Sequence, residues 1–304
     1  MRWLGAFVVL AGAAFFLGDY HNDVYRKMLL WVTLALGYNF LFGICGQVAF
    51  SHFAFYGIGA YSVVMLFVHL QLPLPMAIVL GVVICVAVAL AVAIPATRLE
   101  GFYLALATLA LAQLFLVVLN EGGDLTGGTG GIANYRLPAI LGFELRGARY
   151  TAVIVALLLG TYLLLRKLDE SWFGRACRAV RDNPEAAAAM GVNVARTKVA
   201  AFTLTSALAG VAGMVYAFVD NTVNPPIFGL ENAFLLLFMV IVGGSGRHAG
   251  AALGAVLLFL LPFWLAPLVG HHHVLVFGVL MLAAILVQPK GLIGLWDRFS
   301  KSGG

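Results

Sequence analysis

The sequence predicts an all-α integral membrane protein with about ten transmembrane helices and a short helix outside the membrane. Of its 304 residues, 62% are apolar and only 10% are charged, and the mean hydropathy is +1.01. A soluble domain carries about 25% charged residues, so this chain has too few to cover a water-facing surface, which excludes a soluble globular enzyme. The apolar runs are long and unbroken rather than alternating, which favours membrane helices over a β-barrel.

The predicted spans follow from runs that contain no Asp, Glu, Lys or Arg. These runs are residues 3–18, 28–97, 101–120, 150–165, 199–219, 232–246 and 248–289. A spanning helix needs roughly 20 residues, so the second run has room for about three spans and the last for about two. The other runs fit one span each. The total is about ten spans in a single transmembrane domain over residues 1–304.

Polar or helix-breaking residues divide the long runs. The first break runs from Gly43 through Gln47 to Ser51 and His52. The second is the Leu-Pro-Leu-Pro stretch at 72–75, whose two prolines lack backbone donors. The third lies near residues 270–273, where three consecutive histidines follow a glycine.

The distribution of Lys and Arg predicts the orientation. Ten spans place both termini on one side, which then holds 13 of the 18 Lys and Arg residues and leaves 5 on the other. By the positive-inside rule, both termini and the polar segment 171–198 are cytoplasmic, and the loop 121–147 is external. The net charge of +5 therefore reflects membrane orientation and gives no reason to expect nucleic acid as a partner.

The sequence contains no set of residues for catalysis or metal binding. Walker-type phosphate loops and the G-x-S-x-G, H-E-x-x-H and C-x-x-C motifs do not occur. The three histidines at 271–273 lack a nearby Cys or acid, so we expect an exposed cluster there rather than a metal site. Charges are also missing from the predicted spans, so a proton relay through carboxylates is excluded. A sodium-coupled carrier that uses backbone carbonyls remains an alternative.

Segment 171–198 is the one sizeable polar insertion on the predicted inner face. Asn183 can cap a helix, Pro184 fits its first position, and Glu185 lies in its first turn, where the helix dipole favours an anion. Alanines 186–189 propagate the helix and Gly191 can end it. Upstream, Arg175, Arg178 and Arg181 recur every three residues. These arginines fit a role in setting the membrane orientation or in binding anionic lipid head groups. The helix with two defined ends is not explained by either role, and it favours a docking element for a cytoplasmic partner.

The same segment carries a family resemblance. Glu185, Ala186, Ala187 and Gly191 are similar to the E-A-A-x-x-x-G motif of ABC importer permeases. The stretch 173–217 resembles the permease subunits of high-affinity branched-chain amino acid ABC transporters. Five further blocks resemble that family in the same order, at residues 36–61, 99–113, 125–132, 241–255 and 288–296. The resemblance therefore covers nearly the whole chain.

The resemblance implies a transmembrane subunit of an ATP-driven importer in the bacterial cytoplasmic (inner) membrane. Its expected partners are a second related permease, two cytoplasmic ATP-binding subunits, an external solute-binding protein and membrane lipid. ATP and Mg²⁺ would be bound by the ATP-binding subunits, and this chain would hold no cofactor. The helix at 185–191 would be a coupling helix that docks on the ATPase, together with Arg175, Arg178 and Arg181. A permease of the same family that carries urea or short amides is the nearest alternative.

The break at residues 43–59 is the second candidate site. Gly46, Gln47, Ser51 and His52 are polar or small residues at or near membrane depth. They fit a re-entrant turn that satisfies its own backbone, and they also fit the lining of a translocation pathway. The two interpretations are compatible. Members of the resembling family commonly carry Ser where this chain has Ala49 and Gly where it has Ser51, which leaves the exact substrate open.

Overall fold

The computed structural model describes residues 19–97, 99, 101–133, 135, 139–140, 143–144, 147–219, 221–269 and 278. The longer helices are α2 (Asp19–Asn39), α3 (His52–Val68), α4 (Leu74–Ala96), α5 (Phe102–Glu121), α6 (Ala148–Glu170), α9 (Val194–Ala217), α10 (Leu230–Gly243) and α11 (His248–Val269). Two shorter helices, α7 (Trp172–Asp182) and α8 (Pro184–Ala189), precede α9. The π-helix η1 (Phe40–Ile44) extends α2.

Short 3₁₀ turns and strands join these helices. The turns are η2 (Gly123–Leu125), η3 (Gly128–Gly130) and η4 (Pro225–Phe228), and the strands are β1 (Ile132–Ala133), β2 (Ala139–Ile140), β3 (Phe143–Glu144) and β4 (Thr222–Val223). With two residues in each strand, helices dominate the described part of the chain. The predicted class, an all-α integral membrane protein, is confirmed.

Within the described residues, six helical segments are long and apolar enough to cross a membrane. They are His21–Ile44, Leu74–Ala96, Phe102–Glu121, Arg149–Glu170, Val194–Ala217 and Pro225–Gly243. Two shorter apolar helices are His52–Val68 and His248–Trp264. The predicted first span at 3–18 and nearly all of the run after residue 269 lie outside the described residues, so the structure does not establish a count of ten.

Two of the predicted breaks lie where the sequence places them. The segment α2–η1 ends at Ile44 and α3 begins at His52, and α4 begins after Pro73. The third break, at 270–273, lies outside the described residues. The helix that enters the run 28–97 begins before it: α2 begins at Asp19, so the charged residues between the first two runs lie in the first turns of this helix. The reason is a network in which Arg26 donates to Asp23 (2.7 Å) and to Thr151 of α6 (2.9 Å).

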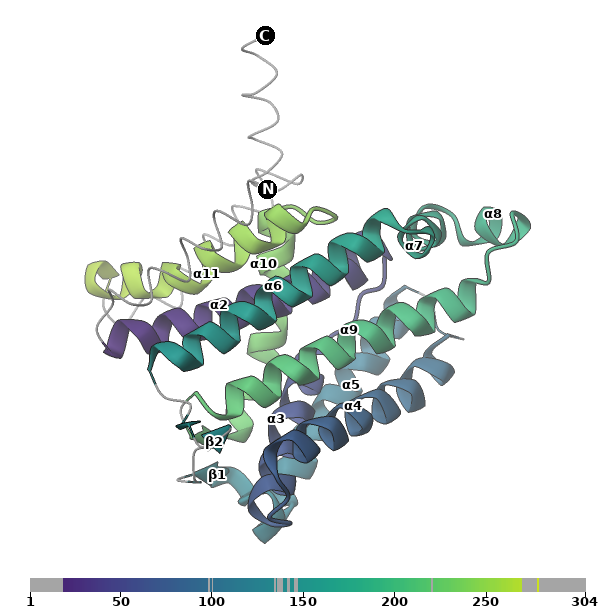
Figure 1. Cartoon of the computed structure of the whole chain (residues 1–304). Helices are drawn as coiled ribbons and strands as arrows, with labels where there is room; N and C mark the ends of the chain where they lie inside the picture. The colour runs from purple at the N-terminus through teal and green to yellow at the C-terminus, as the bar shows by residue number, and fades with distance from the viewer. Residues whose placement is uncertain are drawn as a thin grey trace.

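The core forms where α9 packs between its neighbours through small residues. Figure 1 shows α9 passing beside α3 and α4, below α2 and α6 in that view. A Cβ on Gly59 of α3 would lie 1.9 Å from the carbonyl oxygen of Gly210 of α9. A Cβ on Gly213 would lie 1.8 Å from the carbonyl oxygen of Tyr56. Only glycine permits backbones this close, so the α3–α9 pair is a tightly packed unit.

The two ends of the helix bundle differ in structure. At one end, β1 pairs antiparallel with β4, with Ile132 opposite Val223, so the loops at 121–147 and 221–229 meet. The helices α7 and α8 lie at the opposite end of α6 and α9 (Figure 1). The predicted external loop and the predicted docking segment therefore lie at opposite ends of the bundle.

Candidate functional site

Segment 171–198 folds into two short helices whose beginnings are capped by side chains. The Ser171 hydroxyl accepts a hydrogen bond from the Phe173 amide (3.1 Å) at the start of α7. The Asn183 side chain accepts from the Ala186 amide (2.9 Å) at the start of α8, and Pro184 is the first residue of that helix. Gly191 has a φ of +86°, the left-handed conformation that ends a helix. The predicted helix with defined ends is confirmed.

Helix α8 projects from the end of the bundle with one side free. Glu185, Ala186 and Gly191 are exposed, and the neighbouring Met190 is 86% exposed. Ala187 is buried at 4%, so it anchors α8 to the rest of the chain. The other exposed apolar side chains of α8 are alanines, so with Met190 they form a small, largely apolar surface that a protein partner can approach closely. A docking role for these residues remains a prediction.

The three arginines of α7 bind neighbouring elements of the same chain. Arg178 forms an ion pair with Asp169 at the end of α6. Arg181 donates to the carbonyl oxygen of Gly43 in η1 (2.7 Å), and the exposed Arg175 donates to the carbonyl oxygen of Glu170 (3.2 Å). These contacts fix α7 against α6 and η1. Contact of the same arginines with an ATPase also remains a prediction.

The turn between η1 and α3 contacts the docking segment at Arg181 of α7 and at Lys198 of α9. Gly46 has a φ of +74°, and a Cβ there would lie 2.5 Å from Cγ of Arg181. The Gln47 side chain donates to the carbonyl oxygen of Lys198 in the first turn of α9 (3.1 Å). The Phe50 amide donates to the Thr108 hydroxyl of α5 (3.0 Å). A movement of α7 or of the start of α9 would therefore act directly on this turn.

A groove of about 210 Å³ brings residues of the two predicted sites together. Gly46 and Gln47 line it from the turn, and Arg181 and Pro184 line it from the docking segment. The sequence predicts two separate sites here, because their residues lie more than 130 positions apart in the chain. The blocks 36–61 and 173–217 both resemble the same permease family. No residue pattern in the sequence indicates that the two blocks are in contact.

Ser51 and His52 lie deeper and are not among the residues that line this groove. Their exposed fractions are 1% and 2%. Within the described residues, neither ring nitrogen of His52 nor the hydroxyl of Ser51 has a hydrogen-bond partner. The His52 ring packs against Tyr38 of α2, with 5.5 Å between the ring centroids. Since buried polar groups are nearly always paired, these side chains are candidates for a functional role.

The thiols of Cys45 and Cys177 are neighbours at the contact between the turn and α7. Both side chains are buried and free of disulfide. The adjacent Cys45 thiol and burial raise the pKa of the Cys177 thiol. Cys177 therefore stays protonated at physiological pH and packs as a small apolar side chain.

The glycine-rich loop after α5 packs against the loop that contains β4. A Cβ on Gly131 would lie 2.1 Å from the carbonyl oxygen of Val223. That loop is therefore folded tightly against β4. Among the described residues, no group of three or more His, Cys, Asp or Glu side chains is placed to hold a metal ion. The three histidines at 271–273 lie outside the described residues.

Comparison with known proteins identifies the family. A family model described as "Branched-chain amino acid transport system / permease component" matches residues 22–285. The high-affinity branched-chain amino acid transport system permease protein LivM of Salmonella typhimurium is 28% identical, over 89% of this chain and 69% of that protein. LivM of Escherichia coli is 28% identical over 96% of this chain and 74% of its own length.

Permeases named LivH are also among the relatives. The probable branched-chain amino acid transport permease protein LivH of Methanocaldococcus jannaschii is 32% identical, over 65% of this chain and 66% of that protein. No solved structure matches the chain. Because the family model covers most of the sequence, the chain belongs to the permease components of branched-chain amino acid transport systems.

Proposed function

We propose that this chain is the transmembrane permease subunit of an ATP-driven, ABC-type importer for branched-chain or similar amino acids. The observation that carries the proposal is α8, a capped helix with an exposed surface. It is flanked by α7, whose Arg181 donates to Gly43, and by α9, whose Lys198 carbonyl accepts from Gln47. The family membership and the names of the LivM and LivH relatives support the substrate class. The chain itself has no phosphate loop, so ATP binding and hydrolysis belong to a partner.

The proposed topology has ten spans with both termini in the cytoplasm of a bacterial cell, in the inner membrane. Eight apolar helical segments lie within the described residues, and the sequence supplies a further apolar run at each end of the chain. The excess of Lys and Arg on the side of α7 and α8 supports a cytoplasmic position for that end.

The proposed assembly contains four kinds of partner. A second related permease completes the membrane unit, and two cytoplasmic ATP-binding subunits dock below, each with ATP and Mg²⁺. An external solute-binding protein delivers the amino acid at the end where β1 pairs with β4, and lipid surrounds the helices. The occurrence of both LivM and LivH among the relatives supports a system with two permeases.

Two routes connect α8 to the membrane helices in this proposal. In the first, α8 pushes on α9, which follows it after only four residues. In the second, Arg181 pulls on the carbonyl of Gly43 and thereby on the turn between η1 and α3. Since α3 packs tightly on α9, both routes move the same pair of helices and open the pathway to one side or the other.

Two alternatives make different predictions. A permease for urea or short amides would keep every contact described above and differ only in the solute that its binding protein delivers. A sodium-coupled secondary carrier would have no use for an exposed, capped α8. The sodium-coupled carrier is disfavoured because it needs no docking surface, so the exposed α8 and the contacts of its neighbours α7 and α9 with the turn would have no role.

Cross-linking tests the docking surface directly. In the complex with its native partners, Met190→Cys should cross-link to an ATP-binding subunit with a short thiol-reactive reagent. Leu163→Cys is the matched control, because Leu163 is exposed on α6 away from α8. Cross-linking of Met190→Cys but not of Leu163→Cys supports the proposal. A complex that transports normally and gives no Met190→Cys product contradicts it.

A further inference from the structure

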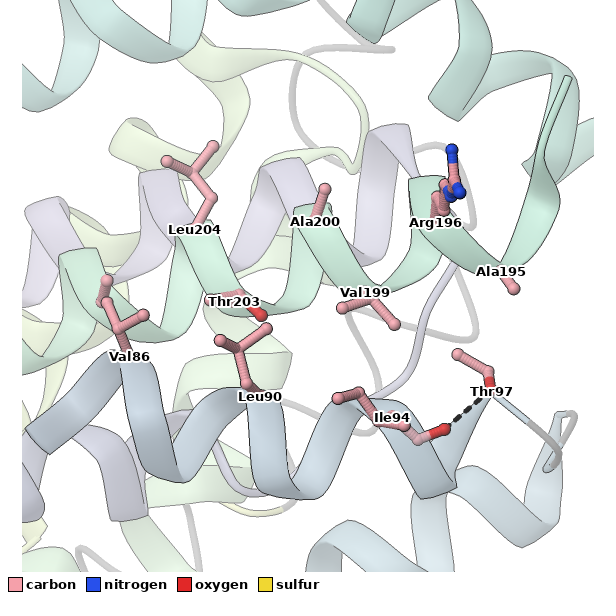
Figure 2. Close-up of a pocket in the computed structure, with 11 residues that line it drawn as sticks. Val86, Leu90, Ile94, Thr97, Ala195, Arg196, Val199, Ala200, Thr203 and Leu204 are labelled. Carbon is pink, nitrogen blue, oxygen red and sulfur yellow. Dashed lines mark hydrogen bonds between the residues drawn. The ribbon is translucent and has the colours of Figure 1, made fainter. Parts of the chain in front are cut away.

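A groove of about 670 Å³ lies along α4 and α9, apart from the turn and the docking segment. Its lining is almost entirely apolar, as Figure 2 shows. Val86, Leu90 and Ile94 point from α4 toward α9, and Ala200 and Leu204 lie on the far side of α9 in that view. The groove lies on two candidate membrane spans, so its opening faces the bilayer or a neighbouring subunit.

The length of the groove matches one leaflet of a membrane. It extends along α9 from Ala207 to Ala195. At about 1.5 Å per residue this is about 18 Å. Half of the hydrocarbon core of a bilayer is about 15 Å thick. An extended acyl chain laid in the groove would therefore reach from the end of the helices to the middle of the membrane.

A cation lies at the end of the groove where the helices leave the membrane. Arg196, in the first turn of α9, lines this end, and Thr97 lines it from the last turn of α4. Arg196 is exposed, and its guanidinium extends away from α4, beyond the apolar strip (Figure 2). No carboxylate is among the lining residues. The electrostatic character of this end therefore favours an anion at the height of the lipid head groups.

We propose that this groove binds an anionic phospholipid of the cytoplasmic leaflet. One acyl chain lies along Leu90, Ile94 and Val199, and the phosphate lies beside Arg196. The assignment to the cytoplasmic leaflet rests on the proposed function, which places α8 in the cytoplasm. Basic positions between transmembrane helices on that side are a known basis of anionic lipid binding.

The transported amino acid fits this groove less well. A zwitterionic amino acid needs an acceptor for its ammonium group as well as a donor for its carboxylate. Away from the mouth of the groove, the lining offers one hydroxyl, that of Thr203. A helix of the second permease is the remaining competitor, and the experiment distinguishes it.

Lipid retention in the purified native complex tests the proposal. Native mass spectrometry would compare bound phosphatidylglycerol with bound phosphatidylcholine after exchange into each lipid. The unmodified complex should retain phosphatidylglycerol preferentially. Val199→Trp fills the groove and should lower retention by about tenfold, the equivalent of ~1.4 kcal/mol. Leu90→Trp is a second groove-filling variant for the case that Val199→Trp does not assemble. Arg196→Gln should lower the preference for phosphatidylglycerol by about fivefold.

Two control variants and a cross-linker complete the test. Val117→Trp on the exposed face of α5 and Arg166→Gln on α6 should behave like the unmodified complex. A photo-reactive phenylalanine at position 90 should capture lipid. Capture of the second permease, or retention that no groove variant changes, overturns the proposal. Because retention is measured without transport, a failure of ATP-driven uptake would leave this result standing and count only against the proposed function.

Discussion

Gly46 holds its position because it has no side chain. Its φ of +74° lies in the left-handed region, and the space where a Cβ would stand is filled by the Arg181 side chain. The sequence predicts Gly46 as a site residue and Arg181 as another, but not the contact between them. Contacts between residues this far apart depend on tertiary packing, which helical periodicity and caps do not encode.

Gly46→Ala should lower uptake by about tenfold through this contact, the equivalent of ~1.4 kcal/mol in the transport step. The added methyl group displaces Arg181 and breaks its hydrogen bond to Gly43. Gly123→Ala is the matched control: its φ is also positive, at +55°, but nothing lies within 4 Å of the added Cβ. Uptake assays with quantified membrane insertion would compare the two. Equal losses in both variants would show that backbone strain, rather than Arg181, is responsible.

His52→Leu tests whether the buried imidazole acts in transport. The ring has no hydrogen-bond partner among the described residues, so its removal breaks no bond, and thermal stability should stay within about 1 kcal/mol of the unmodified protein or rise. Uptake should fall if the ring faces the pathway. Thr205→Val is a control, because the Thr205 hydroxyl bonds only to backbone of its own helix. Normal uptake in His52→Leu would place the ring in the structural core.

At the scale of elements, the sequence predicts most of α8. The cap at Asn183, the proline at 184 and the terminating Gly191 all lie where their side-chain chemistry places them. These are local interactions within a few residues, which explains why the sequence reveals them. The charge-free run at 28–97 does not reveal that α2 begins at Asp19, because the contact that accommodates the charge is not local. Arg26 is accommodated by Thr151, which is 125 residues away in the chain.

Gly191→Pro should abolish uptake while the protein still inserts. Proline cannot adopt a φ of +86°, and it removes the amide that donates to the carbonyl oxygen of Ala188 (3.0 Å). The end of α8 is misdirected, but nothing lies within 4 Å of a Cβ at this exposed position, so the fold elsewhere is spared. Gly191→Asn is the control, since asparagine tolerates the left-handed conformation. The measurement pairs uptake with recovery of the ATP-binding subunit. Full activity in Gly191→Pro would show that residues 184–191 have no role in docking the ATP-binding subunit.

At the scale of the whole molecule, the sequence predicts the division into two ends. Charge-free runs and their breaks place α3, α4, α5 and α9 correctly, because hydrophobic length dominates membrane insertion. The charge-free runs do not predict that β1 pairs with β4. This pairing brings the loop after α5 into contact with the loop after α9. The groove between α4 and α9 is likewise visible only once the helices are packed.

Labelling of single cysteines in intact cells tests the orientation of the two ends. A membrane-impermeant reagent added from outside should reach positions in 121–133 and 221–231. It should fail to reach exposed positions in 171–198, such as Ala186→Cys, until the cells are opened. Labelling of Ala186→Cys from outside would show that the end of the bundle with α8 is external. That result would contradict the proposed topology and the docking of an ATP-binding subunit on α8.

Reconstituted transport tests whether this chain works as a subunit of an ATP-driven importer. The chain would be placed in liposomes with its second permease and ATP-binding subunits, and uptake of leucine would be measured in the presence of the binding protein. We expect uptake that requires ATP and all subunits, with no uptake and no ATP hydrolysis by this chain alone. Uptake of leucine by the isolated chain, driven by a sodium gradient without ATP, would contradict it.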